Sequence, residues 1–296
     1  MNTSKETLID LQPDKDFFIG IDSDGCVFDS MEIKHKKCFA PTLINHFNLQ
    51  SVSKYATETW EFVNLYSRTR GTNRFTGLIS TLDILVQRDE VIMQKLQIPE
   101  FQSIRNWIKT ESKLGNPSLK KAVDETNDYD LSRLYNWSFE VNETIGKIVR
   151  NIPPFSYVKK SLEKINNNAD AIVISSANQD SLNREWSEND LEQYVRFIAG
   201  QETGNKKDCF RQAAEGKYSP EKTLMVGDAP GDMAAAKANN ALFFPIIPGE
   251  EEKSWELFYN EGLDKFFEGS YAGEYEEKLI NNFFDHLPDL PPWKKK

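Results

Sequence analysis

Two aspartates stand in alternate positions at the end of a short apolar run, in the segment Ile21-Asp22-Ser23-Asp24-Gly25. A carboxylate at the first position can attack a substrate or bind a cation, and one at the second can give and take a proton. Most paired aspartates near strand ends are only solvated loop residues. The pair alone therefore does not decide between a catalytic and a solubilising role.

A second acidic cluster favours the catalytic role. The segment Val226-Gly227-Asp228-Ala229-Pro230-Gly231-Asp232 follows another apolar run. Its carboxylates add oxygen ligands of the kind that hard cations such as Mg²⁺ prefer. Because open α/β sheets bind ligands at the carboxyl ends of their strands, the two acidic segments predict one shared site.

Two further segments contain candidates for phosphate binding. Ser175 and Ser176 follow a third apolar run, where they could begin a helix whose backbone N–H groups face a phosphate; ordinary helix capping is the alternative. Lys206 and Lys207 follow the apolar run at 195–199 and could neutralise phosphate charge, although surface lysines are common. We choose Lys206 and keep Lys207 as the alternative.

A parallel sheet is needed to bring these segments together. Short apolar runs typical of strands lie at 17–21, 171–175, 195–199, 223–227 and 241–246. Their continuous apolar character favours burial on both faces, and the helical patterns between them favour crossover connections. We therefore predict an α/β fold with a Rossmann-like parallel sheet.

The long interval between the first two strands predicts an inserted domain. About 150 residues separate them, far more than one crossover needs. Helical patterns rich in aromatic residues fill the interval, so we predict an α-helical cap at 32–152 and a core made of 1–31 and 153–296. The segment Asn151–Pro154, which ends in two prolines, is interpreted as the end of one helix and the start of another, where the chain returns to the core.

Composition restricts the environment and the partners. The formal net charge of −10 opposes binding to nucleic acid, and no basic run compensates for it. No apolar run approaches the roughly 20 residues of a membrane span, and the N-terminus lacks a secretory pattern. Three cysteines without a C-x-x-C pair suit reduced thiols. We expect a cytoplasmic protein with neither nucleic acid nor membrane as a partner.

Two groups of residues receive no chemical role. His35, His46 and His286 occur singly, without the spacing of metal ligands. The aromatic stretch from Glu250 onward is expected to cover the core, and it leaves the formation of a homodimer open.

In order and spacing, the motifs IDSDG, IVISS, the Lys206-Lys207 pair and VGDAPGD resemble those of the haloacid dehalogenase superfamily. The resemblance covers roughly residues 16–31 and 153–247, while the cap and the C-terminal region match only in placement. It implies a Mg²⁺-dependent phosphatase acting on a small phosphorylated metabolite. The acidic group of Asp24 favours phosphate esters, because the related dehalogenases and phosphonatases lack one at that position.

The resemblance also implies a role for each motif. Asp22 would attack phosphorus to form an aspartyl-phosphate, and Asp24 would protonate the leaving oxygen and then activate water. Ser175 would bind a phosphate oxygen, with Ser176 beside it, and Lys206 would screen the negative charge. The ligands of Mg²⁺ would be Asp22, Asp24 through its backbone carbonyl, Asp228 and Asp232.

The cap contributes two further candidates and leaves two other functions open. Its segment 66–74 is polar and basic, at a position that resembles cap specificity loops, and Arg70 and Arg74 are candidate substrate ligands; a solvated helix connector is the alternative. A phosphomutase would form the same aspartyl-phosphate and pass the phosphoryl group to a sugar. A catalytically idle binding module would retain the fold without the reaction.

Overall fold

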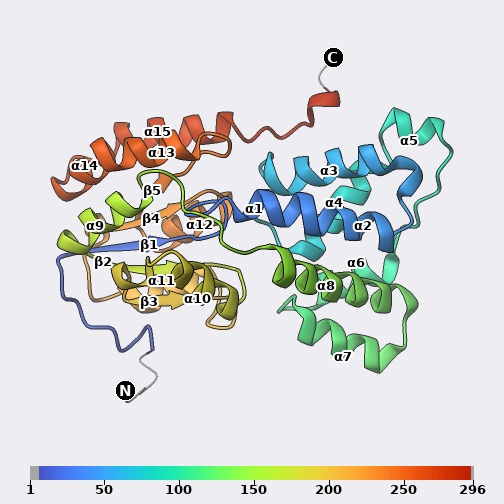
Figure 1. Ribbon diagram of the computed structural model, residues 1–296, viewed down its shortest axis with the longest axis horizontal. Coiled ribbons are helices and arrows are strands. Elements are labelled where there is room, and N and C mark those ends of the chain that lie inside the picture. The colour runs from blue at the N-terminus through green and yellow to red at the C-terminus, as the bar shows by residue number, and fades with distance from the viewer. Residues whose placement is uncertain (1–6, 295–296) are drawn as a thin grey trace. The chain divides into compact units, whose positions relative to one another are not determined.

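The computed structural model describes residues 7–294, which form two compact units (Figure 1). The first unit takes the residues up to Met31 and Asn151–Leu287. The second takes Glu32–Arg150 and the described residues after Leu287. The sequence assigned everything from 153 onward to the core, so the structure differs in grouping the C-terminal end with the helical unit.

One parallel sheet organises the described part of the first unit. Its strand order is β3-β2-β1-β4-β5. The strands are β1 (Phe17–Ile21), β2 (Ala169–Ile174), β3 (Phe197–Ala199), β4 (Thr223–Gly227) and β5 (Leu242–Pro245). Ile21 at the end of β1 lies opposite Val173 of β2 and Val226 of β4. The predicted α/β fold with a parallel sheet is therefore confirmed, and its three central strands end at a common edge.

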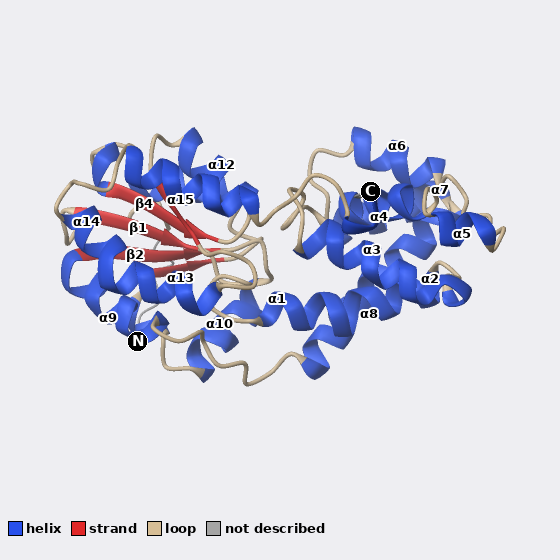
Figure 2. Ribbon diagram, turned by 90° about the horizontal axis from the view of Figure 1, so that it is seen from above, coloured by secondary structure: helices blue, strands red, loops and turns tan. Residues whose placement is uncertain are grey.

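Helices cover both faces of this sheet (Figure 2). They are α9 (Val158–Asn168), α10 (Gln179–Glu188), α11 (Lys206–Ala214), α12 (Pro230–Ala238), α13 (Glu251–Leu257), α14 (Leu263–Phe267) and α15 (Glu274–Asp285). Because side chains of a strand alternate between faces, neighbouring residues of β1 pack in different layers. Phe18 joins the core cluster that includes residues of α11, α12 and α15. The ring of Phe17 contacts Phe266 and Phe267 of α14, with ring centroids 5.2 Å apart in both pairs.

The second unit is helical, as expected of the inserted cap. It contains α2 (Ala40–His46), α3 (Ser53–Leu65), α4 (Arg74–Leu85), α5 (Asp89–Met93), α6 (Gln102–Thr110), α7 (Asn116–Thr126) and α8 (Tyr129–Ile148). The short helix α1 (Ser30–Ile33) crosses the boundary between the units and continues as a π-helical turn, Lys34–Phe39. Trp60 and Trp137 are fully buried in the core of this unit, with ring centroids 6.0 Å apart.

The return of the chain to the sheet unit differs from the prediction. Helix α9 begins at Val158, so the predicted helix start at 151–154 is wrong. Pro154 instead forms a bridge with Phe28, and the N–H of Phe155 donates to the carbonyl of Val27 at 3.0 Å. The returning segment therefore lies beside the loop that follows Asp22.

The described residues after Leu287 pack on the helical unit through Trp293. The guanidinium carbon of Arg88 lies 4.0 Å from the centroid of the Trp293 ring. The same ring stands edge-to-face on Phe62, with centroids 5.7 Å apart. A cation over an indole face is a favourable contact, so it helps to hold this segment on the second unit. No helix among the described residues has the length and apolarity of a membrane span.

Candidate functional site

Three buried carboxylates meet at the carboxyl edge of the sheet. Asp22 follows β1, Asp228 follows β4, and Asp232 lies in the first turn of α12. One oxygen from each of the three lies within 4.8 Å of the others. Asp22 is 4% exposed, and the other two are 0% exposed. Carboxylates this close and this buried repel one another unless positive charge is placed among them.

Lys206 supplies one positive charge from the start of α11. Its Nζ lies 3.0 Å from Oδ2 of Asp22 and 2.6 Å from Oδ1 of Asp232. Burial works against the charge of this ammonium, but the two carboxylates outweigh it and raise the pKa of Lys206 well above its usual value. Burial in turn raises the pKa of Asp232, against the attraction of Lys206. The adjacent Lys207 is exposed, so the structure places Lys206 at the carboxylates.

The donor set fits a divalent cation. Three carboxylates against one ammonium leave two net negative charges in the cluster. Oδ1 of Asp22 is buried and has no hydrogen-bond partner among residues 7–294. A buried carboxylate oxygen left in this way is costly unless a ligand or cation binds it. Hard divalent cations take oxygen ligands of this type.

Asp24 lies on a tight loop that follows Asp22. Gly25 has a φ of 76°, a conformation that glycine adopts readily, and its N–H donates to the carbonyl of Phe28 at 2.8 Å. The hydroxyl of Ser30 donates to Oδ1 of Asp24. The carboxylate of Asp24 is half-buried and separate from the three-carboxylate cluster. Its predicted contact with a metal through the backbone carbonyl stays a prediction.

Ser175 follows β2 and therefore lies at the same edge of the sheet as Asp22. Ser175 is 3% exposed, and its Oγ accepts the N–H of Ala177 at 3.3 Å. Ser176 is exposed. Asn178 caps α10 by accepting the first backbone N–H groups of the helix. The capping role thus belongs to Asn178, and phosphate binding by the two serines stays a prediction.

The two cap arginines have partners inside the helical unit. Arg70 is buried and donates to the carbonyl of Leu65 at 2.8 Å. Arg74 donates to Oδ1 of Asn142 at 2.7 Å, and its guanidinium carbon lies 5.1 Å from the centroid of the Phe39 ring. Burial lowers the pKa of Arg74 to about 10. Contact of either arginine with a substrate stays a prediction.

Sequence reasoning missed two tryptophans that bind the loop after Asp22. The indole N–H of Trp186 donates to Oγ of Ser23 at 3.0 Å. The indole N–H of Trp255 donates to the carbonyl of Cys26 at 2.7 Å. Both rings are 0% exposed. Single tryptophans in helical patterns predict only core packing, so their hydrogen-bond partners carried no signal in the sequence.

A family model described as haloacid dehalogenase-like hydrolase matches residues 72–245, more than half of the chain. The chain belongs to the haloacid dehalogenase-like hydrolases. The matched range contains Ser175, Lys206, Asp228 and Asp232, whereas Asp22 precedes it. The predicted membership of this superfamily is confirmed.

Solved structures that are similar to this haloacid dehalogenase-like chain have low sequence identity to it. A provisionally assigned phosphoglycolate phosphatase from Lactobacillus delbrueckii subsp. bulgaricus is 12% identical, with a TM-score of 0.50, over 88% of this chain and 100% of that one. A haloacid dehalogenase-like family hydrolase from Xanthomonas campestris is 11% identical, with a TM-score of 0.46, over 88% and 96%. The L-2-haloacid dehalogenase from Xanthobacter autotrophicus is 14% identical, with a TM-score of 0.38, over 76% and 75%. No curated protein matches the chain.

Proposed function

We propose that this haloacid dehalogenase-like hydrolase is a Mg²⁺-dependent phosphatase that hydrolyses small phosphorylated metabolites through an aspartyl-phosphate on Asp22. The proposal rests on the different surroundings of the two oxygens of the Asp22 carboxylate. Oδ2 pairs with Lys206 at 3.0 Å, which fixes the orientation of the group. Oδ1 is buried without a hydrogen-bond partner in the described part of the chain. An oriented carboxylate oxygen that no donor occupies is suited to nucleophilic attack.

The first step transfers the phosphoryl group to the enzyme. Oδ1 of Asp22 forms a bond to phosphorus as the bond between phosphorus and the ester oxygen breaks. Asp24 gives its proton to the departing alkoxide, which leaves as an alcohol. The ammonium of Lys206, 3.0 Å from Asp22, reduces the repulsion between the nucleophile and the anionic ester.

The second step releases phosphate. The carboxylate of Asp24 takes a proton from water as the water oxygen attacks phosphorus, and the bond between phosphorus and Asp22 breaks. Asp22 is restored as a carboxylate, and Asp24 is again protonated for the next cycle. Acid–base assistance of this type contributes about 10² to 10⁴ in rate.

Asp228, Asp232 and the backbone carbonyl of Asp24 would hold the Mg²⁺ ion, together with the carboxylate oxygen of Asp22 that does not attack phosphorus. When bound, the ion supplies positive charge close to the phosphate oxygens. The oxygen-only donor set and the two net negative charges of the cluster support this assignment. Ser175, Ser176 and Lys206 would receive the phosphate, and Arg70 and Arg74 remain candidates for the rest of the substrate.

A panel of phosphate monoesters tests the proposal. We expect release of inorganic phosphate that requires Mg²⁺, stops on addition of EDTA and is absent from Asp22→Asn. Isomerisation of a sugar phosphate without release of phosphate would instead identify a phosphomutase. An idle binding module would show no turnover and no stabilisation of the fold by Mg²⁺ with beryllium fluoride, and that pair of results would refute the proposal.

A further inference from the structure

The loop from Asp22 to Phe28 is organised by the residue between the two aspartates. The carbonyl of Ser23 accepts the N–H of Val27 at 2.9 Å and that of Phe28 at 3.2 Å. The residue is 0% exposed, so its hydroxyl points into the protein. Because Ser23 is bonded to both Asp22 and Asp24, a rotation of its backbone would move both carboxylates.

Trp186 fixes the hydroxyl of Ser23 from α10. Its indole N–H donates to Oγ of Ser23 at 3.0 Å. Its ring stands edge-on to Phe28, with centroids 6.0 Å apart and an interplanar angle of 89°. Trp186 therefore contacts the beginning and the end of the loop. A satisfied hydrogen bond between buried side chains rigidifies the groups that it joins.

The sheet edge fixes α10 in turn. Gln179 is the first residue of this helix, and its Nε2 donates to the carbonyl of Ile198 in β3 at 2.8 Å. Its Oε1 accepts the N–H of Gly200 at 2.9 Å. The two bonds hold the start of α10 against the end of β3. The sheet thus sets the position of α10 and of Trp186 on it. Trp186 in turn holds the loop that contains the two aspartates.

We propose that Trp186 is a positioning residue for Asp22 and Asp24: its indole N–H fixes Ser23 and thereby places both carboxylates at the edge of the sheet. The consequence for turnover rests on the proposed phosphatase function. The consequence for binding of a divalent cation to the three-carboxylate cluster depends only on the position of Asp22.

Trp186→Phe tests the proposal, because it keeps a ring beside Phe28 and removes the N–H donor. Tyr271→Phe is a matched control: Tyr271 is fully buried in the same unit and donates to the carbonyl of Phe243 at 2.8 Å. For Trp186→Phe we expect kcat to fall by about 10-fold to 100-fold, as is typical when an outer support of a site is removed. KM should stay within about twofold, because the residues proposed to receive the substrate are unchanged. The control should keep its kcat.

Ser23→Ala removes the acceptor of the same hydrogen bond and completes a double-mutant cycle. If Trp186 acts through Ser23, the double variant will be no slower than the slower single variant. If the double variant instead loses rate by the product of the two single losses, the proposal is overturned. An equal loss of thermal stability in Trp186→Phe and Tyr271→Phe, with kcat unchanged in both, would overturn it as well.

Titration with Mn²⁺, followed by electron paramagnetic resonance, separates this inference from the proposed function. We expect the Kd for Mn²⁺ to rise by about 10-fold in Trp186→Phe and to stay unchanged in Tyr271→Phe. A wild-type chain that binds Mn²⁺ but hydrolyses no ester would defeat the phosphatase proposal, and the titration would still decide the role of Trp186. Equal Kd values in the two variants would overturn the positioning role.

Discussion

Gly227 leaves the space that Asp232 occupies. A methyl group on Gly227 would overlap the Cβ and the carboxylate carbon of Asp232. In that space, Oδ2 of Asp232 accepts the N–H of Ala229 at 3.0 Å, and Oδ1 accepts Lys206 at 2.6 Å. The glycine at the end of β4 therefore allows the first turn of α12 to return its carboxylate to the cluster.

Gly227→Ala should displace this carboxylate. We expect a loss of about 1–3 kcal/mol in the free energy of unfolding, because the added methyl group forces a packed segment to move. Binding of Mn²⁺ should weaken as well. Gly231→Ala is the matched control in the same motif, because a Cβ at Gly231 meets no atom within 4 Å beyond its chain neighbours and the backbone of its own helix. Thermal unfolding and Mn²⁺ titration of the two variants check this, and equal behaviour would contradict the steric argument.

The central strands and the acidic cluster could be predicted because their signals are local. The predicted strands at 17–21 and 223–227 match β1 and β4, since each is a short apolar run that ends at a polar motif. The parallel arrangement of these strands then brings Asp22 and Asp228 to one edge. The choice between Lys206 and Lys207 was harder, because both follow the same run and only the start of α11 decides which one points to the carboxylates.

Other features depend on partners distant in the sequence. Strand β2 begins at Ala169 and includes Asp170, a residue disfavoured in strands. Asp170 is accommodated because its carboxylate finds donors in three other segments of the chain. The contacts of Trp186 and Trp293 could not be predicted either, since an indole in a helical or proline-rich segment does not reveal which group it will contact.

Lys206→Met should separate the two neighbouring lysines. It removes the ammonium that lies between Asp22 and Asp232, so the buried carboxylates lose their compensating charge. We expect the free energy of unfolding without metal to fall by about 3–5 kcal/mol, as for breaking a buried ion pair. Added Mg²⁺ should restore part of this stability. Turnover should fall to background.

Lys207→Met is the control, since its side chain is exposed. We expect unfolding free energy within about 0.5 kcal/mol of wild type, as for most surface substitutions, and unchanged turnover. Denaturant unfolding with and without Mg²⁺ measures both variants. Equal losses in Lys206→Met and Lys207→Met would contradict the assignment of the charge to Lys206.

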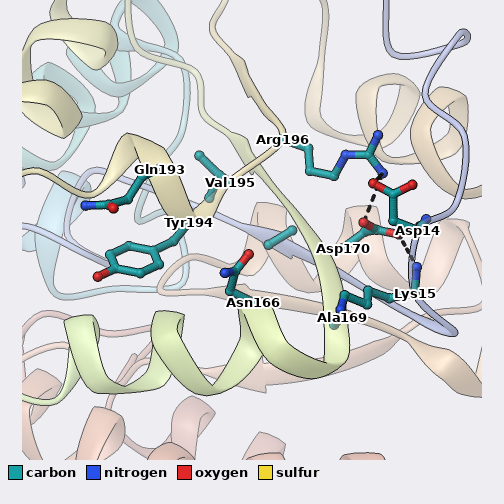
Figure 3. Close-up of a pocket in the computed structure, with 10 residues that line it drawn as sticks. Asp14, Lys15, Asn166, Ala169, Asp170, Gln193, Tyr194, Val195 and Arg196 are labelled. Atoms are coloured by element: carbon teal, nitrogen blue, oxygen red, sulfur yellow. Dashed lines mark hydrogen bonds and ion pairs between the residues drawn. The ribbon is translucent and has the colours of Figure 1, made fainter.

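Asp170 should contribute stability that depends on pH. Figure 3 shows its carboxylate beside Arg196, Asp14 and Lys15 in a pocket at the start of β2. It accepts Arg196 at 3.0 Å, Tyr218 at 2.8 Å and the backbone N–H groups of Asp14 and Lys15 at 2.8 and 3.0 Å. Burial opposes the charge of this carboxylate, but the donors outweigh it and lower the pKa of Asp170 below its usual value.

A lowered pKa in the folded state stabilises the fold above the pKa of the unfolded chain, about 3.9 for aspartate, and this contribution disappears as the pH falls through the lower folded value. Asp170→Asn should therefore unfold more easily than wild type by about 1–3 kcal/mol at neutral pH, and the difference should shrink below about pH 4. Asp16→Asn is the control, because it removes the charge of an exposed aspartate. Oδ2 of Asp16 lies 3.7 Å from Nζ of Lys222. A difference that grows on acidification would contradict the argument.

Asp22→Asn and Asp24→Asn should separate the two steps of the proposed reaction. Both substitutions preserve the size of the side chain, and both should abolish steady-state turnover. An amide at position 22 is a poor nucleophile, so Asp22→Asn should form no covalent phosphate. An amide at position 24 can neither protonate a leaving group nor activate water, but an activated ester such as p-nitrophenyl phosphate needs little protonation. Asp24→Asn should therefore become phosphorylated slowly and release the phosphate more slowly still.

Acid quenching after incubation with a ³²P-labelled activated ester measures the covalent species directly. Label retained by Asp22→Asn, or undiminished hydrolysis by either variant, would contradict the division of roles between the two aspartates while leaving the fold assignment intact.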